Sequence, residues 1–437
     1  MIAEKMIFAA TSDIAGQVRG KSFPAAMLEK RLRRGVGWTP TNVQITCFDS
    51  IGDSPYGALG DLLLVPDPAA HVHVDFEDGT PPEDFMLGDI VTLEGDPWEC
   101  CTRSILKSAL ARLKAVGGLR LVGAFEHEFH LKGPAGASRP SYSLAGYRDR
   151  SAFGSTLMAA LDAAGLEADT FMKEFGPDQY EVTIGPSRGV AAADASVILR
   201  EMIHATARRY GEAASFTPIR HPDGVGNGVH IHFSFEGADG RPATYDPQGT
   251  HGMAPKTASF VAGILKYLDA IVAFTAPSAI SYLRLTPHRW SAAFNNLGVR
   301  DREASVRICP TTARDVDSIA RQFNIEYRAA DGAASPHLAL AAIAFAGAQG
   351  IEEGLPAPPA TQEDLSLLDA AALAARGYTR LPQGLDEALA RMMANDIVRG
   401  WFPARFCEIY RDHKLCELRH VAAMDAAARC AAYEAVY

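Results

Sequence analysis

The sequence lacks the motifs by which many nucleotide-binding proteins are recognised. Its 437 residues contain neither a Walker-type nor a dinucleotide-binding glycine motif, and GVGNG before His230 is too short for either. Cysteine is scarce: the seven cysteines are scattered without a CxxC pair, which favours reduced thiols that serve packing in a cytosol. Internal repeats are missing as well. Any nucleotide must therefore be held by a different architecture.

Positive charge is also in short supply. The formal net charge is −10, with 42 lysines and arginines against 52 acidic residues, so the chain offers no general attraction to nucleic acid or an anionic membrane. The apolar run at residues 6–10 is too short for a signal sequence or a membrane span. We therefore expect a cytoplasmic protein whose partners are small molecules, with no nucleic acid and no membrane among them.

The residues that are present indicate a globular protein in two parts. Residues 1–96 consist of short apolar runs broken by Gly, Pro and Asp, which predicts a small β-rich domain. Residues 97–437 alternate strand-like stretches such as LRLVGAFEHEFHL with helix-like stretches such as ASVILREMIHATARRYG, and the segment from Leu385 on is almost wholly helical in pattern. The chain is thus predicted to be an α+β protein.

Four strand-like segments share an unusual design, with one apolar face and one face of acids, histidines or arginines at period two. The polar faces carry Glu126, Glu128 and His130; Glu181, with Glu174 seven residues before it; His230, His232 and Ser234; and Glu326 with Arg328. Each segment alone is typical of an exposed face on an antiparallel edge strand. Lysine is missing from all four faces, however, and converging carboxylates would repel one another unless cations neutralised them.

These faces favour a metal site that handles phosphate. Hard divalent ions such as Mg²⁺ or Mn²⁺ prefer carboxylate oxygen, and two such ions commonly clamp a transferring phosphoryl group. Positive charge for phosphate oxygens is supplied by Arg300, Arg302 and Arg307 in VRDREASVRICP. The alternative is a network of structural salt bridges between the same acids and arginines.

The motifs FEHEF, KEFGPDQYEV, GNGVHIHFSF, APSAISYLRL, DREASVRI and IEYRAADGAASPHLALAA follow one another in the order found in glutamine synthetases, and DIAGQVRGKSFP is similar to that family's first strand pair. The chain resembles this family over almost its entire length. The resemblance implies an N-terminal β-grasp domain at 1–96 and a catalytic domain at 97–437, an antiparallel half-barrel backed by helices. It also implies a dodecamer of two stacked hexameric rings, with active sites between neighbouring subunits.

The resemblance assigns roles residue by residue. It implies ATP as co-substrate and two or three Mg²⁺ or Mn²⁺ ions, held by Glu128, Glu174 and Glu181 on one side and by Glu126, His230 and Glu326 on the other. It implies that ATP and its transferring phosphate contact His232, Ser234, Arg302 and Arg307, and that glutamate contacts Gly226, Arg284 and Arg328. Arg284, Arg302 and Asp49 are the expected catalytic residues. The implied reaction forms a γ-glutamyl phosphate, which a nitrogen nucleophile then attacks.

One position departs from the family pattern. Glutamine synthetases carry a glutamate six residues after the SYxRL arginine, where it helps to deprotonate ammonium, and this chain has Trp290 there. An indole accepts no proton, but its face packs against an amine or holds an ammonium. Asp49 or Asp53 is a candidate for amine recognition. The pattern resembles the γ-glutamylamine ligases, which join glutamate to an organic amine.

Alternatives to an amine ligase stay open at this point. An ammonia-using glutamine synthetase would need another base in place of the missing glutamate. Trp290 could also be a packed loop residue without a substrate contact, or the acid substrate could differ from glutamate. From a different class comes an inactive structural or regulatory assembly, although such a protein has no need for six metal ligands together with four arginines.

Overall fold

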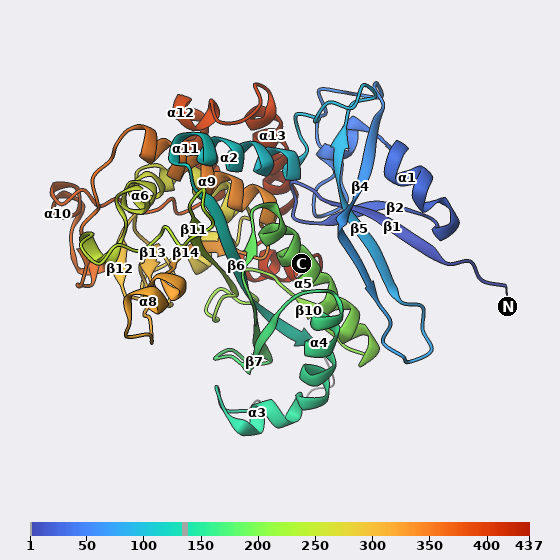
Figure 1. The fold of residues 1–437 in the computed structure, drawn as a ribbon, viewed down its shortest axis with the longest axis horizontal. Helices are drawn as coiled ribbons and strands as arrows, with labels where there is room; N and C mark the ends of the chain where they lie inside the picture. Colours follow the sequence, from blue (N-terminus) through green and yellow to red (C-terminus); the bar gives the residue numbers. More distant parts are fainter. Residues whose placement is uncertain (1, 133–138) are drawn as a thin grey trace.

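The computed structural model describes residues 2–132 and 139–437 and consists of two β-sheets with helices packed around the larger one (Figure 1). The smaller sheet is formed by β1 (Met6–Ser12), β2 (Val18–Pro24), β3 (Val36–Trp38), β4 (Leu62–Val74) and β5 (Glu83–Val91). Its strand order is β2-β1-β5-β4-β3, with β1 parallel to β5 and the other pairs antiparallel. The helix α1 (Leu28–Arg34) packs on β4. This arrangement confirms the predicted small β domain.

The larger sheet carries the polar strand faces. Its strands are β6 (Arg120–Lys132), β7 (Ala168–Lys173), β8 (Gln179–Ile184), β9 (Ser187–Arg188), β10 (Ala213–Ser215), β11 (Gly228–Glu236), β12 (Leu297–Val299), β13 (Val306–Ile308), β14 (Ile325–Asp331) and β15 (Ala360–Thr361). The order is β15-β12-β13-β14-β11-β6-β8-β7, so the four strands with polar faces are consecutive inner neighbours. The alternative of four edge strands is therefore wrong.

The other α-helices of the described residues lie in the larger domain. They are α2 (Thr102–Gly117), α3 (Leu144–Asp149), α4 (Ser151–Ala163), α5 (Val190–Arg209), α6 (Pro255–Thr275), α7 (Ser281–Arg284), α8 (Val316–Gln322), α9 (Pro336–Glu352), α10 (Ala370–Ala375), α11 (Leu385–Ala394), α12 (Asp396–Arg399), α13 (Phe406–Val421) and α14 (Ala426–Glu434). Several of them, such as α2, α5 and α6, contact the larger sheet. The predicted helical patterns, including the C-terminal one, are confirmed. Phe125, Ile231 and Phe233, which alternate with the polar residues, are fully buried against this helical layer.

One of these helices has the composition of a membrane span. α6 is long and apolar enough to cross a bilayer, with a mean hydropathy of 1.5. However, 78% of this apolar stretch of α6 is buried inside the protein, where the helix packs against α9 and α11. Its apolar surface is therefore satisfied by the protein core.

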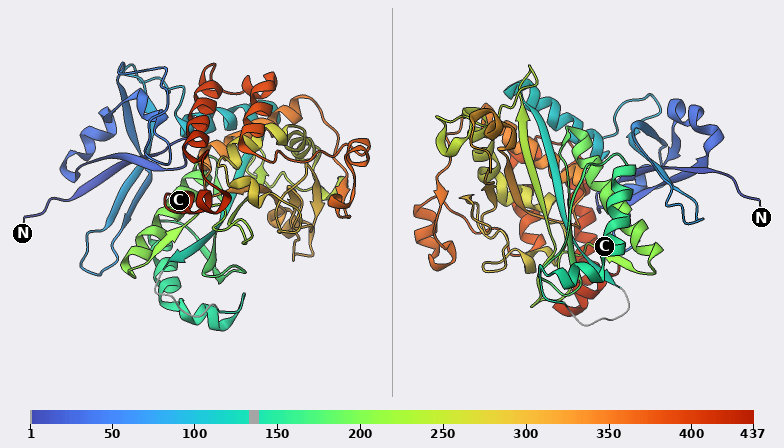
Figure 2. Two further views of the ribbon diagram at one scale, coloured as in Figure 1. Left: turned by 180° about the vertical axis from the view of Figure 1, so that it is seen from behind. Right: turned by 60° about the horizontal axis from the view of Figure 1, so that its bottom comes forward.

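The two sheets are joined by buried polar contacts. Arg103 at the start of α2 is almost fully buried and bridges Asp67 and Asp89 of the small sheet to Asp194 of α5, at N–O distances of 2.8, 3.1 and 2.9 Å. Seen from behind, the C-terminal helices lie against the small domain (Figure 2). The hydroxyl of Tyr437, the last residue, donates to the carbonyl of Ala15 in that domain. Asp194 also contacts His337 and Asp89 also contacts Lys107, so among the described ion pairs Asp67 depends on Arg103 alone.

Candidate active site

Strand register brings the predicted metal ligands together. His230 of β11 pairs with Glu126 of β6, and Glu128 of β6 pairs with Glu181 of β8. Nδ1 of His230 lies 3.4 Å from Oε2 of Glu126 and 3.7 Å from Oε1 of Glu326 on β14. Ligand atoms of Glu126, Glu181 and His230 all lie within 4.8 Å of one another. Four neighbouring strands thus present their acids and histidine to one point.

The sixth predicted ligand is held by a loop. Glu174 follows β7 and is buried, and its Oε2 accepts hydrogen bonds from the hydroxyl of Tyr142 at 2.9 Å and from the backbone N–H of Phe175 at 2.8 Å. Glu128 is positioned by two donors, the backbone N–H of Gly228 at 2.8 Å and the side-chain amide of Gln179 at 3.3 Å. These contacts fix the carboxylates in place before any ion binds.

The electrostatics show how much negative charge is concentrated here. Burial raises the pKa of Glu181 to about 9, and the carboxylates of Glu126 and Glu128 add to the rise. Burial also raises the pKa of Glu128 to about 7, with a further contribution from Glu174 that the N–H of Gly228 opposes. Both groups therefore favour their protonated forms near neutral pH unless a cation replaces the protons.

Two other acids remain ionised because positive groups surround them. Although burial opposes it, the neighbouring histidines His230 and His232 lower the pKa of Glu126. Burial is likewise outweighed at Glu326, where His230 and Arg328 lower the pKa to about 2. A donor set of carboxylate oxygens and one imidazole fits hard divalent ions of the Mg²⁺ or Mn²⁺ kind.

Arginines line the same region. Nη1 of Arg307 is 2.7 Å from Oε2 of Glu326, and Nη1 of Arg328 contacts the other oxygen of that carboxylate. Arg328 also donates through Nε to the carbonyl of Arg302 at 3.0 Å, while the Arg302 side chain itself is exposed. The arginines do form salt bridges, as the alternative reading predicted, but they form them at the edge of the metal-ligand cluster.

A glycine makes room for the arginine predicted to bind glutamate. Arg284 is buried at the end of α7 and donates to the carbonyl of Ala330 at 2.8 Å. A Cβ on Gly226 would lie 2.4 Å from Cγ of Arg284 and 2.9 Å from the carbonyl oxygen of Pro218. Because such distances are not tolerated, only glycine lets the Arg284 side chain pass at this point.

A cavity of about 240 Å³ opens beside the predicted metal ligands, and two of the residues predicted to bind ATP line it. His232 and Ser234 of β11 line it together with Arg321 and Asn324. Nδ1 of His232 is 2.9 Å from Oδ1 of Asn324. Arg321, at the end of α8, supplies a cation at this cavity that the sequence motifs did not indicate.

Trp290 lies in an open pocket of about 380 Å³ and is 56% exposed. Its ring stands edge-to-face with that of Phe175, with 5.6 Å between centroids. The other lining residues are Asp223, Gly224, Val225, His288 and Arg289. The backbone of Trp290 has φ +52° and its carbonyl accepts a hydrogen bond from Arg328 at 3.3 Å. Most of the indole faces solvent, so Trp290 is not a buried packing residue, and its contact with substrate stays a prediction.

The predicted amine-site aspartates lie elsewhere in the chain. Asp49, with φ +52°, belongs to a loop of the small domain, and its largely exposed carboxylate pairs with Arg19 at 3.0 Å. Neither Asp49 nor Asp53 is among the described residues that line the Trp290 pocket. Within one chain, the structure therefore does not bring these two aspartates to Trp290.

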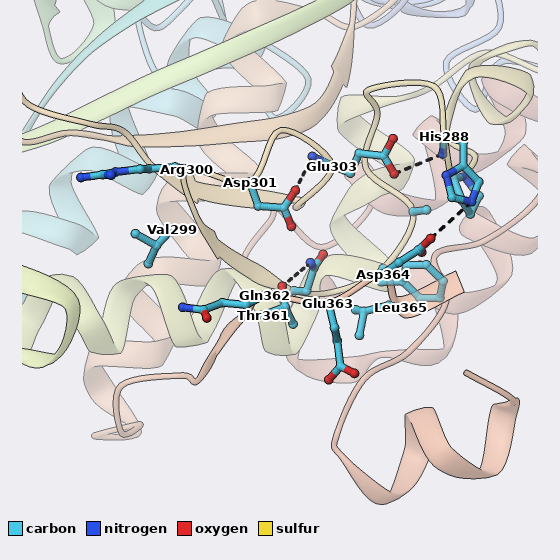
Figure 3. Close-up of a pocket in the computed structure, with 14 residues that line it drawn as sticks. His288, Val299, Arg300, Asp301, Glu303, Thr361, Gln362, Glu363, Asp364 and Leu365 are labelled. Atoms are coloured by element: carbon cyan, nitrogen blue, oxygen red, sulfur yellow. Dashed lines mark hydrogen bonds and ion pairs between the residues drawn. The ribbon is translucent and has the colours of Figure 1, made fainter. Parts of the chain in front are cut away.

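A further cavity, of about 640 Å³, lies beside the loop that carries Trp290 (Figure 3). It is lined mainly by residues 287–303 and 361–365, and His288 borders both this cavity and the Trp290 pocket. His288 Nε2 lies 3.5 Å from a carboxylate oxygen of Asp364, and its backbone N–H donates to Glu303. None of the predicted metal ligands lines this cavity in the described part of the chain.

A mixed sheet whose inner strands present carboxylates, imidazoles and arginines to one point has the donor set that a divalent ion requires. Comparison with known proteins identifies the family. The profile described as "Glutamine synthetase, catalytic domain" matches residues 99–429, and the profile described as "Glutamine synthetase N-terminal domain" matches residues 3–98. The chain belongs to the glutamine synthetase family, and it is an ATP-dependent ligase that forms carbon–nitrogen bonds.

Individual relatives agree with this assignment. The chain is 36% identical over 397 residues to the gamma-glutamylpolyamine synthetase GlnA3 of Streptomyces coelicolor, covering 89% of this chain and 84% of that protein. It is 27% identical over 409 residues to the type-1 glutamine synthetase 1 of Dictyostelium discoideum, covering 88% and 80% of the two chains. The crystal structure of a novel glutamine synthase homolog superposes with a TM-score of 0.91 at 38% identity, covering 100% of this chain and 99% of that one. The resemblance inferred from the motifs is confirmed.

Several residues of the site were not predicted from the sequence. They are Tyr142, Phe175, Gln179, Arg321 and Asn324, together with Cys309, which the cysteine pattern assigned to packing. Phe175 and Gln179 stand inside the KEFGPDQYEV motif, so their proximity to Glu174 and Glu181 was visible in the sequence. The side to which they point was not, because they lie in or beside a turn between strands.

Proposed function

We propose that the protein joins the γ-carboxylate of glutamate to an organic amine and forms a γ-glutamyl amide while ATP is converted to ADP and phosphate. The observation that carries this proposal is the aromatic pair Phe175 and Trp290 at an open pocket beside Arg328. At about 380 Å³ the pocket is about ten times larger than the volume of one water-sized molecule. Ammonia alone would leave such a space mostly filled with water.

The first half of the reaction activates the acid. Arg284 and Arg328 would hold the two carboxylates of glutamate, while Arg302, Arg307 and His232 would hold the phosphates of ATP. The γ-carboxylate attacks the γ-phosphate, ADP leaves, and a γ-glutamyl phosphate results. Divalent ions would be held by Glu128, Glu174 and Glu181 and by Glu126, His230 and Glu326, and they supply charge neutralisation for the phosphates.

The second half joins the nitrogen. An amine bound against Phe175 and Trp290 would attack the acyl carbon, expel phosphate and lose a proton to a carboxylate or to water. The aromatic faces attract the ammonium form of the amine, and close packing excludes water around its carbon chain. Asp223, whose exposed carboxylate lines the same pocket, would pair with a second ammonium group. Together with the polyamine named for the Streptomyces relative, this feature favours diamines and polyamines among the substrates.

Family members are typically oligomeric, and we infer that this chain also forms a dodecamer of two hexameric rings. Asp49 and Asp53 lie on the small domain, away from the pocket of their own chain. A neighbouring subunit would bring these aspartates to the amine, as catalytic and recognition residues. Mixing of two inactive variants, Asp49→Ala and Glu128→Ala, tests this: sites shared between subunits should restore part of the activity.

We place the enzyme in the cytoplasm, where glutamate and ATP are abundant.

The direct test is the release of phosphate from ATP with Mg²⁺ or Mn²⁺ and glutamate. Ammonium, methylamine, ethanolamine, putrescine, spermidine, isopropylamine and aniline are added in turn, and the γ-glutamyl product is identified by mass. We expect an organic amine to be used with a kcat/KM about 2- to 30-fold higher than ammonium, since an aromatic contact adds about 0.5–2 kcal/mol. If ammonium is the best substrate, the protein is a glutamine synthetase with a different base. If nothing stimulates release, the proposal fails.

A further inference from the structure

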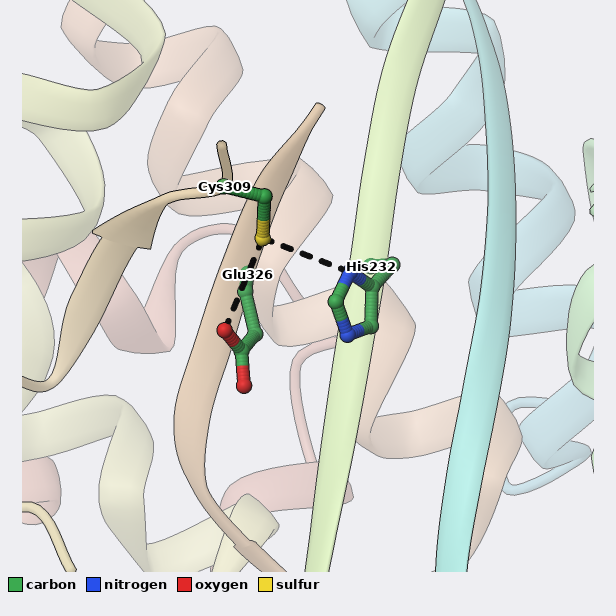
Figure 4. Close-up of side chains that lie close together, drawn as sticks. All are labelled: His232, Cys309 and Glu326. Atoms are coloured by element: carbon green, nitrogen blue, oxygen red, sulfur yellow. Dashed lines mark hydrogen bonds between the residues drawn. The ribbon is translucent and has the colours of Figure 1, made fainter. Parts of the chain in front are cut away.

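A thiol lies inside the region predicted to hold ATP and metal. Cys309 directly follows β13, and its Sγ is 3.6 Å from Nδ1 of His232 and 3.5 Å from Oε2 of Glu326 (Figure 4). The ligand atoms of these three residues all lie within 4.8 Å of one another. A thiol, an imidazole and a carboxylate from three adjacent segments thus face one small volume.

The distances match the edges of a tetrahedral site. Zinc binds thiolate sulfur at about 2.3 Å and imidazole nitrogen or carboxylate oxygen at about 2.0–2.2 Å, so ligands at the tetrahedral angle stand about 3.5 Å apart. The two separations from Sγ of Cys309, 3.6 and 3.5 Å, agree with this value. The three side chains can therefore take up such an ion with little rearrangement.

The surroundings of His232 suit metal ligation. Its Nε2 lies 3.1 Å from Oε1 of Glu126, and a carboxylate behind an imidazole fixes the tautomer whose other nitrogen binds metal. Nδ1, the nitrogen that faces Cys309, also contacts Oδ1 of Asn324 at 2.9 Å. An ion at this position would bind Nδ1 of His232 in place of its contact with Asn324.

Charge near the thiol acts in two directions. Arg307 donates to Oε2 of Glu326 at 2.7 Å, and Arg328 contacts the other oxygen of that carboxylate, so two positive charges repel a cation here. The carboxylate of Glu126, 3.1 Å from Nε2 of His232, attracts one. An ion that binds here therefore competes with Arg307 for Oε2 of Glu326.

We propose that Cys309, His232 and Glu326 form a site for a thiophilic divalent ion such as Zn²⁺ or Cd²⁺, with water as the fourth ligand. Binding forms a metal–sulfur bond and releases the thiol proton to solvent. Mg²⁺ and Mn²⁺ prefer oxygen, so they leave the thiol unused. Because His232 and Glu326 are also the residues proposed to hold ATP and a hard ion, the thiophilic ion displaces them from that role and inhibits the ligase. This inhibition rests on the proposed function, whereas the ion binding does not.

The binding experiment uses the purified full chain and Cd²⁺ alone, in the presence of excess Mg²⁺. We expect one Cd²⁺ per chain, with the ultraviolet absorbance band of a cadmium–thiolate bond. Cys309→Ser should remove the band and weaken Cd²⁺ binding by at least about tenfold, since even an outer-shell partner contributes about 10- to 100-fold. Cys416→Ser is the matched control, because Cys416 is the partly exposed cysteine of α13 and should leave the band unchanged.

Each outcome decides the proposal. A wild-type protein without the thiolate band, or a band that survives in Cys309→Ser, overturns it; Cys309→Ala replaces the serine variant if that variant does not fold. In the activity assay, Zn²⁺ should inhibit phosphate release by the wild type at concentrations at least about tenfold lower than those needed for Cys309→Ser. If Zn²⁺ inhibits the wild type and Cys309→Ser equally, the ion binds at the carboxylate ligands instead, and the proposal is overturned. A thiolate band in a protein without amine-dependent phosphate release keeps the site and rejects the proposed function.

Discussion

The metal-ligand cluster and the Trp290 pocket lie close together but are built in different ways. Five of the six predicted metal ligands are carried by four paired inner strands, and they are buried or half-buried, with Glu326 at 1% and His230 at 9% exposure. The pocket is carried by three loop segments, and its aromatic residues Phe175 and Trp290 are 52% and 56% exposed. Strand register fixes the positions of the strand-borne metal ligands, whereas the positions of the pocket residues depend on loop conformation.

The comparison separates the chemistry from the choice of substrate. Strand-borne ligands vary little in position because every neighbour is tied by backbone hydrogen bonds. The loop residues His288 and Trp290 have φ values of +62° and +52°, a region that costs a residue with a side chain about 1 kcal/mol or more. Loops held in this way can change in sequence without disturbing the sheet. Under the proposed function, substrate choice resides in these loops, where the fold constrains the sequence least.

The largest effect is expected at the cluster. Glu128→Gln keeps the size and hydrogen bonds of the side chain but removes its charge, so kcat should fall by about 10²–10³-fold, the size of loss seen when one electrostatic contact to the transition state is removed. The protein should keep its fold, as measured by circular dichroism and assembly size. His230→Ala should behave alike.

The matched control is Glu236→Gln on the same strand as His230. Glu236 forms a surface ion pair with Arg188, which is worth about 0–1 kcal/mol. The activity of Glu236→Gln should equal that of the wild type. Full activity of Glu128→Gln with unchanged metal content would mean that the cluster is structural, and the contrast between the two regions would disappear.

The second effect concerns the border between the two regions. In Gly226→Ala, the new Cβ would lie 2.4 Å from Cγ of Arg284, so the guanidinium must shift. Because misplacement by about 1 Å can cost about 10²-fold, we expect kcat/KM for glutamate to fall by about 10- to 100-fold. Steady-state kinetics with glutamate varied measure this. Gly37→Ala, where a Cβ meets nothing within 4 Å, is the control and should leave the kinetics unchanged.

The third effect tests the pocket alone. Trp290→Ala removes an aromatic face worth about 0.5–2 kcal/mol, so the amine KM should rise by about 2- to 30-fold while the glutamate KM changes little. Ile397→Ala on α12, at a comparably exposed apolar residue, should change neither value. A rise in the glutamate KM of equal size would show that Trp290 serves Arg328 rather than the amine.

The edge-to-face contact can be measured separately. Phe175→Ala and the double variant with Trp290→Ala complete a double-mutant cycle on the amine KM, and an aromatic pair at 5.6 Å should couple by about 0.5–1.5 kcal/mol. Additive effects would mean that the two rings act on the substrate independently.

The smallest effect is on stability. Burial raises the pKa of Glu128 to about 7 and of Glu181 to about 9, from an ordinary 4.5. A carboxyl with a raised pKa in the folded state stabilises the fold below the unfolded pKa, and this contribution is lost as pH rises through the folded pKa. With EDTA, the Tm should fall by a few degrees between about pH 5 and pH 9.

Divalent ions replace the protons, so the gain in Tm caused by Mn²⁺ or Mg²⁺ should grow with pH over the same range. Glu181→Gln removes one of the two titrating groups and should flatten the dependence. Scanning calorimetry with and without metal provides the measurement. A metal-free Tm that rises over this range would contradict the assignment of these two carboxyls.

Most of the metal-ligand cluster could be predicted from the sequence because the alternation of side chains along a strand is a local property. A strand turns successive side chains to opposite faces, so FEHEF and VHIHFSF state which residues lie together before any partner strand is known. That these strands are inner neighbours could not be read in the same way. Pairing between residues about a hundred positions apart, as for His230 and Glu126, is decided by the packing of the whole sheet.

The sequence by itself determined the α+β class, the two sheets, the polar strand faces and the family, since periodicity and motif order are properties of the chain. The tertiary structure decided which loop residues complete the site. Phe175 meets Trp290, Arg321 borders the nucleotide cavity and Cys309 faces His232 only because distant segments are folded against one another. Loops lack a repeating geometry that would fix where their side chains point, so their contacts follow from the packing of the strands and helices around them.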